Sequence, residues 1–330
     1  MTLYPLLDYL STRPPDMHWQ GWEIGRVSGG HNNLLYHARG PGGDLAVKWT
    51  RRDDRDRAGR ECAALQLLRR RAMHLAPEAL LVDRERYDLP VVVQTWLDGI
   101  AGSAPPESDR QWHALLEHYA AIHTIHQVSS EHDIRPAFVN FASADGGLRR
   151  ARSSAERVPA EAWTAALARL RERMETYSWP VWHVPRLTFC RADPNVTNFV
   201  RSSPGLYSVD WENSGWGDPA FEIGDLLAHP AYLDVSGRRR AWVMRRYAEI
   251  VGVDQIAVRS WVYFCLMCCD WAFFFARKAH EHAADAAHMA RLVDRPAEWY
   301  HGLPRQRDRY TALARRLLDG DPLLDIGVRV

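Results

Sequence analysis

The stretch CRADPNVTNFV, residues 190–200, places an aspartate and an asparagine five positions apart between two apolar segments. LTF precedes the stretch and FV closes it, so both sides of the loop are anchored by hydrophobic residues. A turn that only reverses the chain requires neither a carboxylate nor an amide at fixed positions. Asp193 and Asn198 are therefore candidates for a chemical role, and the rest of the sequence indicates which one.

The composition is that of an ordinary folded protein. The chain has 330 residues, of which 46% are hydrophobic and 25% charged, enough for one large domain or two lobes with a proper core. The formal net charge of +1 gives no overall field that would attract nucleic acid or an anionic membrane. We therefore expect no nucleic-acid partner and no membrane, and any bound anion must be held locally. Nothing in the sequence leads us to infer an obligate protein partner.

The N-terminal residues lack the basic flank and long apolar run of a signal peptide. Five cysteines in a chain of this length are typical of free thiols in a reducing compartment. Both features predict a cytoplasmic protein.

The longest apolar segment is WVYFCLMCCDWAFFFA, residues 261–276. It is shorter than a membrane span and carries Asp270 at its middle, so we predict a buried helix. Its three cysteines resemble a CxxC motif, but no second pair of ligands follows at a suitable spacing. Core packing is the better interpretation of these cysteines than metal binding.

Periodicity divides the chain into a β-rich part and a helical part. Residues 20–50 alternate apolar and polar with glycine punctuation, which predicts three short antiparallel strands. A helix at 56–72 and a buried strand at 90–97 follow. Beyond the Gly, Pro and Ser of DGIAGSAPPES, nearly everything reads as helix, the exception being a hairpin at 186–212. The predicted helices of this part are 108–128, 159–177, 237–251, 256–283 and 306–318. The fold class is therefore α+β, with a small antiparallel β-rich N-lobe at 1–98 and a larger, mainly helical C-lobe at 99–330.

Three features of the N-lobe suit an anionic ligand. The SGGHNN segment begins at Ser28 between two strands, and its paired glycines would let backbone amides cradle phosphate oxygens. Lys48 ends the alternating strand LAVKW, and Glu61 lies on the next helix, where a carboxylate could pair with it and aim the ammonium at a phosphate. Taken singly, each has an ordinary alternative: a plain turn, a solvated lysine and a surface glutamate.

The fourth feature combines the opening pair with Asp210 of YSVDWE. Two carboxylates and an amide form a set suited to phosphoryl transfer. One carboxylate receives the proton of the acceptor hydroxyl, while the other carboxylate and the amide hold magnesium ions, which prefer hard oxygen ligands. Capping of a loop explains any one of these residues, but chance explains the ordered set of four features much less well.

The segment VDWENSGWGDPAFEIGDLL, residues 209–227, resembles the DWE and GDP motifs of the aminoglycoside phosphotransferase and choline kinase family, relatives of the protein kinases. The resemblance covers most of the chain: SGGHNNLLYHA resembles the family's nucleotide loop, LAVKW its lysine strand, GRECAALQLL its glutamate helix, VVVQTWLDG its hinge, and CRADPNVTNFV its catalytic loop.

The resemblance implies a bilobal protein kinase-like fold that binds ATP and Mg²⁺ between the lobes, with GTP left open as the donor. It implies Asp193 as the catalytic base, with Asn198 and Asp210 as magnesium ligands. Lys48, held by Glu61, would contact the α- and β-phosphates. The remaining nucleotide contacts that it implies are Ser28, Gly29, Gly30, His31 and Asn32 of the loop and the hinge backbone at Thr95, Trp96 and Leu97.

The sequence departs from the family pattern at the catalytic loop. The usual His-Gly before the aspartate is Arg191-Ala192 here. Arg191 could support the loop from behind, as the histidine does, or could itself bind phosphate or an acidic substrate. Asp218 and Glu222, where the family usually has aspartate, are expected to be structural. A catalytically degenerate, kinase-like nucleotide-binding or interaction protein stays open as the alternative to an enzyme.

The expected reaction is transfer of phosphate from ATP to a hydroxyl of a small molecule. The segment between Asp210 and the GDP turn is too short to dock a peptide as in a protein kinase, so the acceptor is expected to be aminoglycoside-, choline- or sugar-like. Glu212, Asp234 and Asp270 could suit a cationic acceptor, although each could equally be structural. His123 and His126 lie three positions apart on one helical face, and packing or a buried hydrogen bond is expected for them rather than metal binding.

Overall fold

The computed structural model describes residues 2–14, 17–27, 33–128, 131–203, 205–253, 255–287, 289 and 297–320. The chain forms two compact units. The first unit comprises 1–102, 131–138 and 197–215, and the second comprises 103–130, 139–196 and 216–330. The sequence suggested one boundary near residue 98. The structure differs because two later segments return to the first unit, where strand pairing and loop contacts hold them.

The first unit contains a six-stranded antiparallel sheet with strand order β1-β2-β3-β4-β6-β5. The strands are β1 (His18–Trp19), β2 (Trp22–Val27), β3 (Leu34–Gly40), β4 (Gly43–Trp49), β5 (Ala79–Asp83) and β6 (Val91–Thr95). The three antiparallel strands expected within residues 20–50 and the buried strand at 90–97 are confirmed. The short strands β1 and β5 were not predicted.

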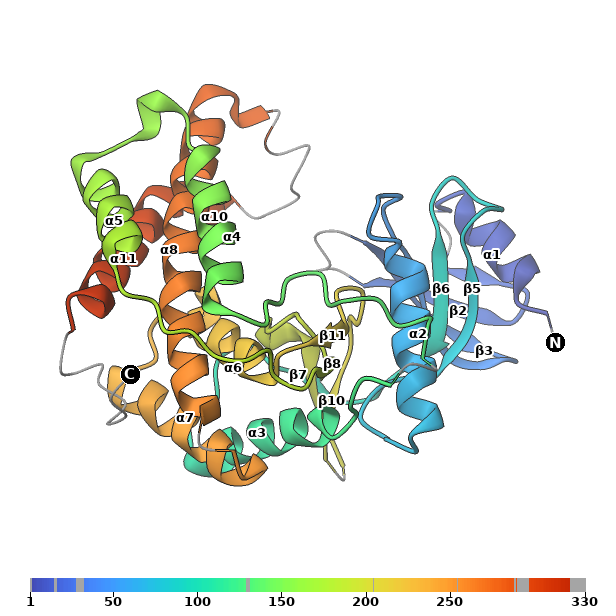
Figure 1. Ribbon diagram of the computed structural model, residues 1–330. Helices are drawn as coiled ribbons and strands as arrows, with labels where there is room; N and C mark the ends of the chain where they lie inside the picture. Colours follow the sequence, from blue (N-terminus) through green and yellow to red (C-terminus); the bar gives the residue numbers. More distant parts are fainter. Residues whose placement is uncertain are drawn as a thin grey trace. The chain divides into compact units, whose positions relative to one another are not determined.

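Two helices cover opposite faces of this sheet, α1 (Tyr4–Ser11) and α2 (Arg57–Arg70) (Figure 1). Val47 and Trp49 of β4 belong to the core that includes the leucines of α1. Because successive side chains of a strand point to opposite faces, Lys48 faces the other side of the sheet. Its neighbour on β6 is Val92, which packs against α2. Strand alternation therefore directs Lys48 toward the helix that carries Glu61.

Two small sheets replace the single hairpin expected at 186–212. The strands β9 (Phe199–Ser202) and β10 (Gly205–Ser208) pair with each other, and β7 (Ile100–Ala101) joins β9. The preceding piece, β8 (Thr188–Cys190), pairs instead with β11 (Gly215–Gly217). The prediction of one hairpin over 186–212 was therefore wrong, because residues 191–198 lie between β8 and β9 and the hairpin of β9 and β10 forms only after them.

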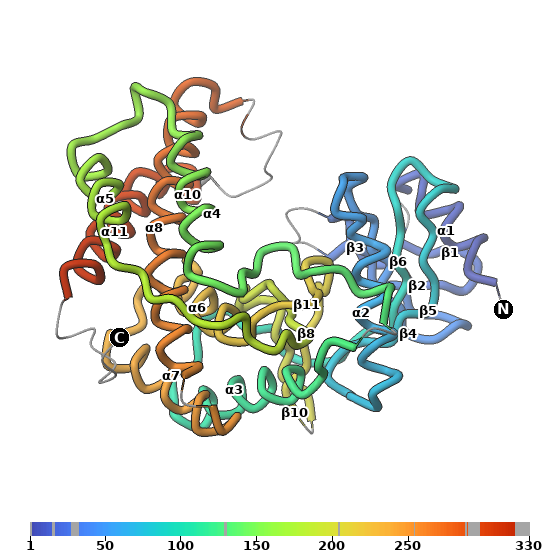
Figure 2. Tube along the Cα trace, viewed as in Figure 1, coloured from blue at the N-terminus to red at the C-terminus, as the bar shows by residue number. Residues whose placement is uncertain are grey.

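The second unit is mainly helical (Figure 2). Its α-helices are α3 (Asp109–His123), α4 (Ala144–Glu156), α5 (Ala165–Thr176), α6 (Pro219–Ala228), α7 (Gly237–Val251), α8 (Gln255–Ala284), α10 (Ala297–His301) and α11 (Leu303–Leu318). The five helices predicted from periodicity are confirmed, with α5 beginning at Ala165 after the short 3₁₀ helix η1 (Ala160–Ala162). A second 3₁₀ turn, η3 (Pro230–Tyr232), follows α6, and η2 (Val196–Asn198) lies in the catalytic-loop region.

The helix α8 is the central element of this unit and packs against α4, α6 and α11. By length and composition, α8 could cross a membrane. However, 83% of the 18-residue apolar stretch that meets this criterion is buried inside the protein. Asp270, at its middle, is hydrogen-bonded to Ser154 at 2.5 Å and to Arg150 at 3.2 Å. Its cysteines are buried free thiols. These observations confirm the prediction of a buried core helix.

Candidate active site

In the first unit, Lys48 lies at the centre of three carboxylates. Its Nζ donates to Glu61 Oε2 at 2.7 Å and to Asp210 Oδ1, and it lies 3.3 Å from Glu212 Oε2. The oxygens of the three acids lie within 4.8 Å of one another. Lys48 and Glu61 are buried, whereas 30% of the Asp210 side chain is exposed. Asp210 is thus the member of the cluster that a ligand can reach most easily.

Electrostatics keep this lysine charged. Burial alone would lower the pKa of Lys48, but the charges of Asp210, Glu61 and Glu212 raise it well above its ordinary value. Burial raises the pKa of Glu61 to about 7, although the Lys48 ammonium acts in the opposite direction. Lys48 therefore stays charged among its carboxylate partners.

Glu212 connects three elements around Lys48. Its Oε2 accepts a hydrogen bond at 2.8 Å from Asn33, which follows the glycine segment. Its Oε1 accepts a hydrogen bond from Arg57, in the first turn of α2. Burial alone would raise the pKa of Glu212, but Lys48 and Arg57 outweigh it and lower the pKa. Glu212 is thus a charged anchor for the nucleotide-loop flank and the glutamate helix.

Asn198 and Asp210 are joined through the backbone. The peptide N–H of Val209 donates to the carbonyl of Asn198 at 2.9 Å, which brings position 198 beside the DWE turn. Asp210 has a φ of +63°, a left-handed conformation that is uncommon outside glycine and turn residues. Asn198 is buried at 7% exposure, and its Nδ2 makes no hydrogen bond to any residue that the structure describes.

The hinge offers less free backbone than the sequence suggested. The N–H of Thr95 donates to Glu78 and that of Trp96 donates to Asp44, at 3.0 and 2.9 Å. The ring of Trp96 stacks on His37 with centroids 3.9 Å apart. Two of the three expected hinge amides are thus engaged within the protein, and the Leu97 amide is the remaining candidate donor. The loop residues Ser28, Gly29, Gly30, His31 and Asn32 lie outside the described residues.

Asp193 belongs to the second unit, at a loop with unusual backbone geometry. Ala192, just before it, has a φ of +56°, in the left-handed region where glycine is favoured. The side chain of Arg191 is fully buried, and its Nη2 donates to the carbonyl of Asp193 at 2.9 Å. Oδ1 of Asp193 accepts from the N–H of Asn195 at 3.1 Å. Of the two roles open to Arg191, burial favours support of the loop over contact with a substrate.

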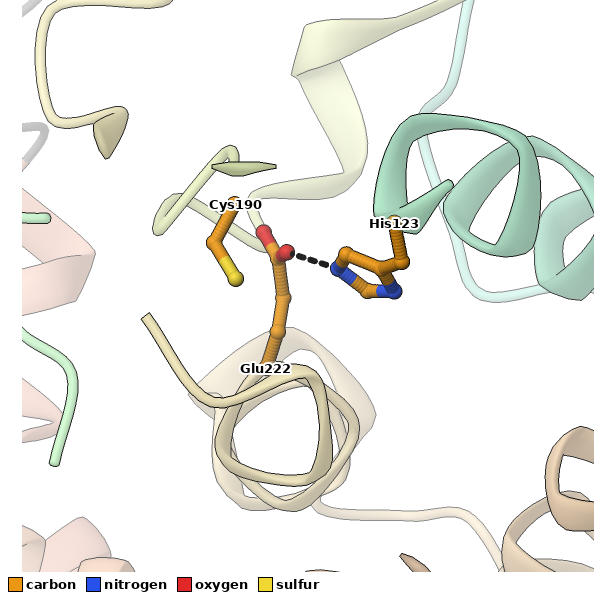
Figure 3. Close-up of side chains that lie close together, drawn as sticks. All are labelled: His123, Cys190 and Glu222. Carbon is orange, nitrogen blue, oxygen red and sulfur yellow. Dashed lines mark hydrogen bonds and ion pairs between the residues drawn. The ribbon is translucent and has the colours of Figure 1, made fainter. Parts of the chain in front are cut away.

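Glu222 of α6 binds the backbone of this loop. Its Oε1 accepts from the N–H of Ala192 at 2.8 Å, and its Oε2 accepts from His123 Nε2 at 2.7 Å (Figure 3). The other ring nitrogen of His123 lies 2.5 Å from the Tyr247 hydroxyl. With the proton on Nε2, the Tyr247 O–H donates to Nδ1. His123 therefore makes buried hydrogen bonds, as expected.

Cys190 completes this buried group, and its thiol lies beside His123 and Glu222 (Figure 3). Burial, reinforced by the charge of Glu222, raises the pKa of Cys190 well above its ordinary value. A protonated thiol is a poor metal ligand, and both ring nitrogens of the histidine are already engaged. The group is therefore a hydrogen-bonded support for the loop that carries Asp193.

Asp218 fixes the start of α6. Its Oδ1 accepts from the N–H of Ala220 at 2.9 Å and caps the helix before Pro219. It also accepts hydrogen bonds from Arg259 at 3.1 Å and from Tyr263 at 3.0 Å. Both carboxylate oxygens of Asp218 thus accept hydrogen bonds from the protein. These bonds fit the structural role expected from the sequence.

The three acids proposed for a cationic acceptor already have protein partners. Glu212 is bound to Lys48 and Arg57 in the first unit. Asp270 is buried against Arg150 and Ser154. The exposed Asp234 pairs with Arg309 of α11. A positively charged acceptor would have to displace an internal cation from each of them.

Comparison with known sequences places this site in a family. A sequence model of the phosphotransferase enzyme family matches residues 23–256, more than half of the chain. The chain belongs to the phosphotransferase enzyme family. The match spans both units and contains Lys48, Asp193 and Asp210. No curated protein sequence matches this family member significantly.

Solved structures of family relatives share the fold at low sequence identity. A Ralstonia eutropha protein provisionally named as an aminoglycoside phosphotransferase is 12% identical, with a TM-score of 0.67 over 96% of this chain and 98% of its own. A choline/ethanolamine kinase family protein from Mesorhizobium loti is 18% identical, with a TM-score of 0.60 over 98% and 97%. Spectinomycin phosphotransferase, solved with ADP and spectinomycin, is 12% identical, with a TM-score of 0.60 over 98% and 99%. The fold is thus that of kinase-like phosphotransferases.

Several residues of the site were not anticipated from the sequence. Arg57 and Asn33 hold Glu212, and Tyr247 completes the network around His123. Arg57 stands four residues before Glu61, one helical turn away on the same face of α2, and this spacing is the signal that could have identified it. Tyr247 lies in α7, 124 positions beyond its partner, and no local pattern points to it.

Proposed function

We propose that the protein transfers the γ-phosphate of ATP to a hydroxyl group of a small molecule. The observation that carries the proposal is the buried Lys48, which is bound to Glu61 of α2 and to the partly exposed Asp210. Such an arrangement presents a positioned cation where phosphate oxygens can replace a carboxylate. Membership of the phosphotransferase enzyme family supports the same conclusion.

In the proposed mechanism Lys48 binds the α- and β-phosphates, and Glu61 orients its ammonium. The Leu97 amide donates a hydrogen bond to the adenine ring. Asp193 accepts the hydrogen bond of the acceptor hydroxyl and takes its proton as the oxygen attacks. The bond from the acceptor oxygen to the γ-phosphorus forms as the bond to the β-phosphate oxygen breaks, and ADP leaves. Positioning and charge neutralisation supply most of the acceleration.

The donor set fits a magnesium ion. Asn198 and Asp210 offer an amide and a carboxylate oxygen, which are hard ligands of the kind that Mg²⁺ prefers. Glu212 offers a further carboxylate within 4.8 Å of that of Asp210. When bound, the ion neutralises phosphate charge. The residues of the chain hold the nucleotide in place and move the proton to Asp193.

The test is thermal unfolding of the purified protein with ATP and MgCl₂, separately and together, followed by the same series with Asp210→Ala. A ligand present at one hundred times its dissociation constant stabilises by about 2.7 kcal/mol. We expect a shift of the melting temperature that requires both components and disappears in the variant. No shift with ATP or GTP would contradict the proposal and favour a degenerate, kinase-like interaction protein.

A further inference from the structure

A cavity of about 440 Å³ lies in the first unit, beside the end of α1. Its volume is within the range of small-molecule sites. Its lining contains two arginines and no acid: Arg13, Pro14, Met17, Arg26, Leu34 and Tyr36. Tyr36 belongs to the core that α1 covers, whereas Lys48 points toward α2 on the other face of the sheet. The cavity is therefore separate from the proposed nucleotide site.

Arg26 occupies a position of β2 at which an apolar side chain is expected. Because side chains alternate along a strand, Trp22, Ile24 and Arg26 point to the same face of the sheet. Trp22 and Ile24 belong to the core that α1 covers, and Arg26 is the exposed member of this row. Its partner in register on β3 is Tyr36, a residue of the same core. A cation in a row of core-facing side chains is unusual, and its presence calls for an explanation.

Arg13 brings a second cation to the cavity from the segment that follows α1. Its φ of +53° lies in the left-handed region, which is disfavoured for a residue with a Cβ atom. Its N–H donates to the carbonyl of Leu10 at 3.0 Å and closes the turn after the helix. The side chains of Arg13 and Arg26 make no hydrogen bond or ion pair with any residue that the structure describes. Two guanidinium groups thus line one cavity without an acid to neutralise them.

The charge and the polarity of the lining define a ligand class. Two guanidinium groups without an acid match a dianion, and a guanidinium binds phosphate oxygens through paired N–H donors. A phosphate monoester carries a charge of about −1.5 to −2 at neutral pH, whereas a carboxylate carries a single negative charge. The other lining residues offer apolar or aromatic contacts to the esterified group, and these residues are Pro14, Met17, Leu34 and Tyr36.

We propose that this cavity binds a small phosphate monoester with an apolar group, and that Arg13 and Arg26 hold its phosphate. The ester neutralises two cations that have no partner among the described residues. The site lies apart from the Lys48 cluster, so the inference does not rest on the proposed phosphotransferase function.

The experiment titrates phenyl phosphate into the nucleotide-free protein by calorimetry. The proteins compared are wild type, Arg13→Gln, Arg26→Gln and the control Arg169→Gln, which changes an exposed arginine of α5 outside the cavity. Wild type should bind one equivalent. Because charge-assisted hydrogen bonds to the phosphate are lost, each cavity variant should raise the Kd about 10- to 100-fold. The control should keep the wild-type Kd, and circular dichroism checks that each variant is folded.

Two further probes test the ligand class. Benzoate keeps the aromatic ring but has a single negative charge, and inorganic phosphate keeps the charge but lacks the apolar group. Both should bind wild type more weakly than phenyl phosphate does, because each satisfies only one part of the lining.

Equal Kd values for phenyl phosphate in wild type and in either cavity variant would place the ligand elsewhere, for example at Lys48, and overturn the inference. Benzoate that binds as tightly as phenyl phosphate, or no binding of phenyl phosphate to wild type, would overturn it as well. Thermal unfolding with MgATP distinguishes this inference from the proposed function. A protein that binds phenyl phosphate at the arginines but does not bind MgATP would refute the phosphotransferase and leave the cavity site in place.

Discussion

The first unit gathers three carboxylates around one buried ammonium, whereas the second unit gives its buried acids separate partners and leaves Asp225 without one among the described residues. Around Lys48 opposite charges attract, and the pKa of the lysine rises, although burial and the neighbouring carboxylates also raise the pKa of Glu61 to about 7. Around Asp225 like charges add, and the pKa of the acid rises. The difference teaches that a buried cation among acids stays charged, whereas a buried acid among other acids keeps its proton.

The largest effect is expected at Asp193. Replacing the proposed base in Asp193→Asn keeps the size of the side chain but removes the proton acceptor, and should lower kcat about 10²- to 10⁴-fold. Steady-state phosphate transfer measures this, with thermal unfolding to show that the fold is intact. The control is Asp145→Asn, at an exposed acid of α4 that forms an ion pair with Arg149 of the same helix. Equal activity of the two variants would remove Asp193 from the mechanism.

Stability should depend strongly on Lys48. Lys48→Met leaves the carboxylates of Glu61, Asp210 and Glu212 without their shared cation, and removing one partner of a buried ion pair destabilises by about 3–5 kcal/mol. Urea unfolding measures the change, and Lys278→Met, which breaks the more exposed pair with Glu281, should cost about 1 kcal/mol or less. Similar losses in both variants would show that opposite charges do not stabilise the cluster as described.

The repulsion among the acids around Asp225 is tested by the pH dependence of the free energy of unfolding. Folded Asp225 keeps its proton to about pH 8, against an ordinary pKa of 3.8. Its contribution to stability is therefore fully present below pH 3.8 and is lost as pH rises toward 8. Asp225→Asn should remove this loss of about 1.4 kcal/mol per pH unit, so the variant should gain roughly 5 kcal/mol over wild type at pH 8.5 relative to pH 4.5. Parallel urea-unfolding curves for the two proteins across this range would contradict this repulsion.

The smallest effect is expected at Ala192. A left-handed φ of +56° disfavours alanine by roughly 1–2 kcal/mol, while glycine loses more entropy on folding, by about 0.4–1 kcal/mol. Ala192→Gly should therefore raise the free energy of unfolding by about 0.5 kcal/mol, as measured by urea unfolding. A loss above about 1 kcal/mol would show that the alanine methyl packs favourably enough to outweigh the backbone strain.

The sequence predicted the elements with strong periodicity. Strands within 20–50, the long helix α8 and the family resemblance all followed from local patterns, and the structure contains them. The helix α4 escaped notice because two glycines stand in its first turn, where glycine disfavours helix. The helix α6 is short. The aspartate that caps it and the proline that begins it were interpreted from the sequence as a turn motif alone.

The candidate site was predictable in its residue types but not in its partners. Lys48 and Glu61 are 13 positions apart on adjacent elements, so alternation and helix periodicity are enough to propose the pair. The bonds that Glu212 makes to Arg57 and Asn33 span 155 and 179 positions. Only the tertiary fold decides which distant cation a buried acid meets, and for that reason Glu212 and Asp270 looked like acceptor ligands in the sequence.

The link between Glu222 and the backbone of Ala192 has a consequence for protein engineering. Arg191, Ala192 and Glu222 differ from the residues expected from the family resemblance. Arg191 and Glu222 both bind the backbone of residues 192–193. If the loop alone were exchanged for the His-Gly-Asp sequence expected from the resemblance, Glu222 would still be one methylene longer than the aspartate expected at its position. We expect a functional chimera to require exchange of the loop and of position 222 together.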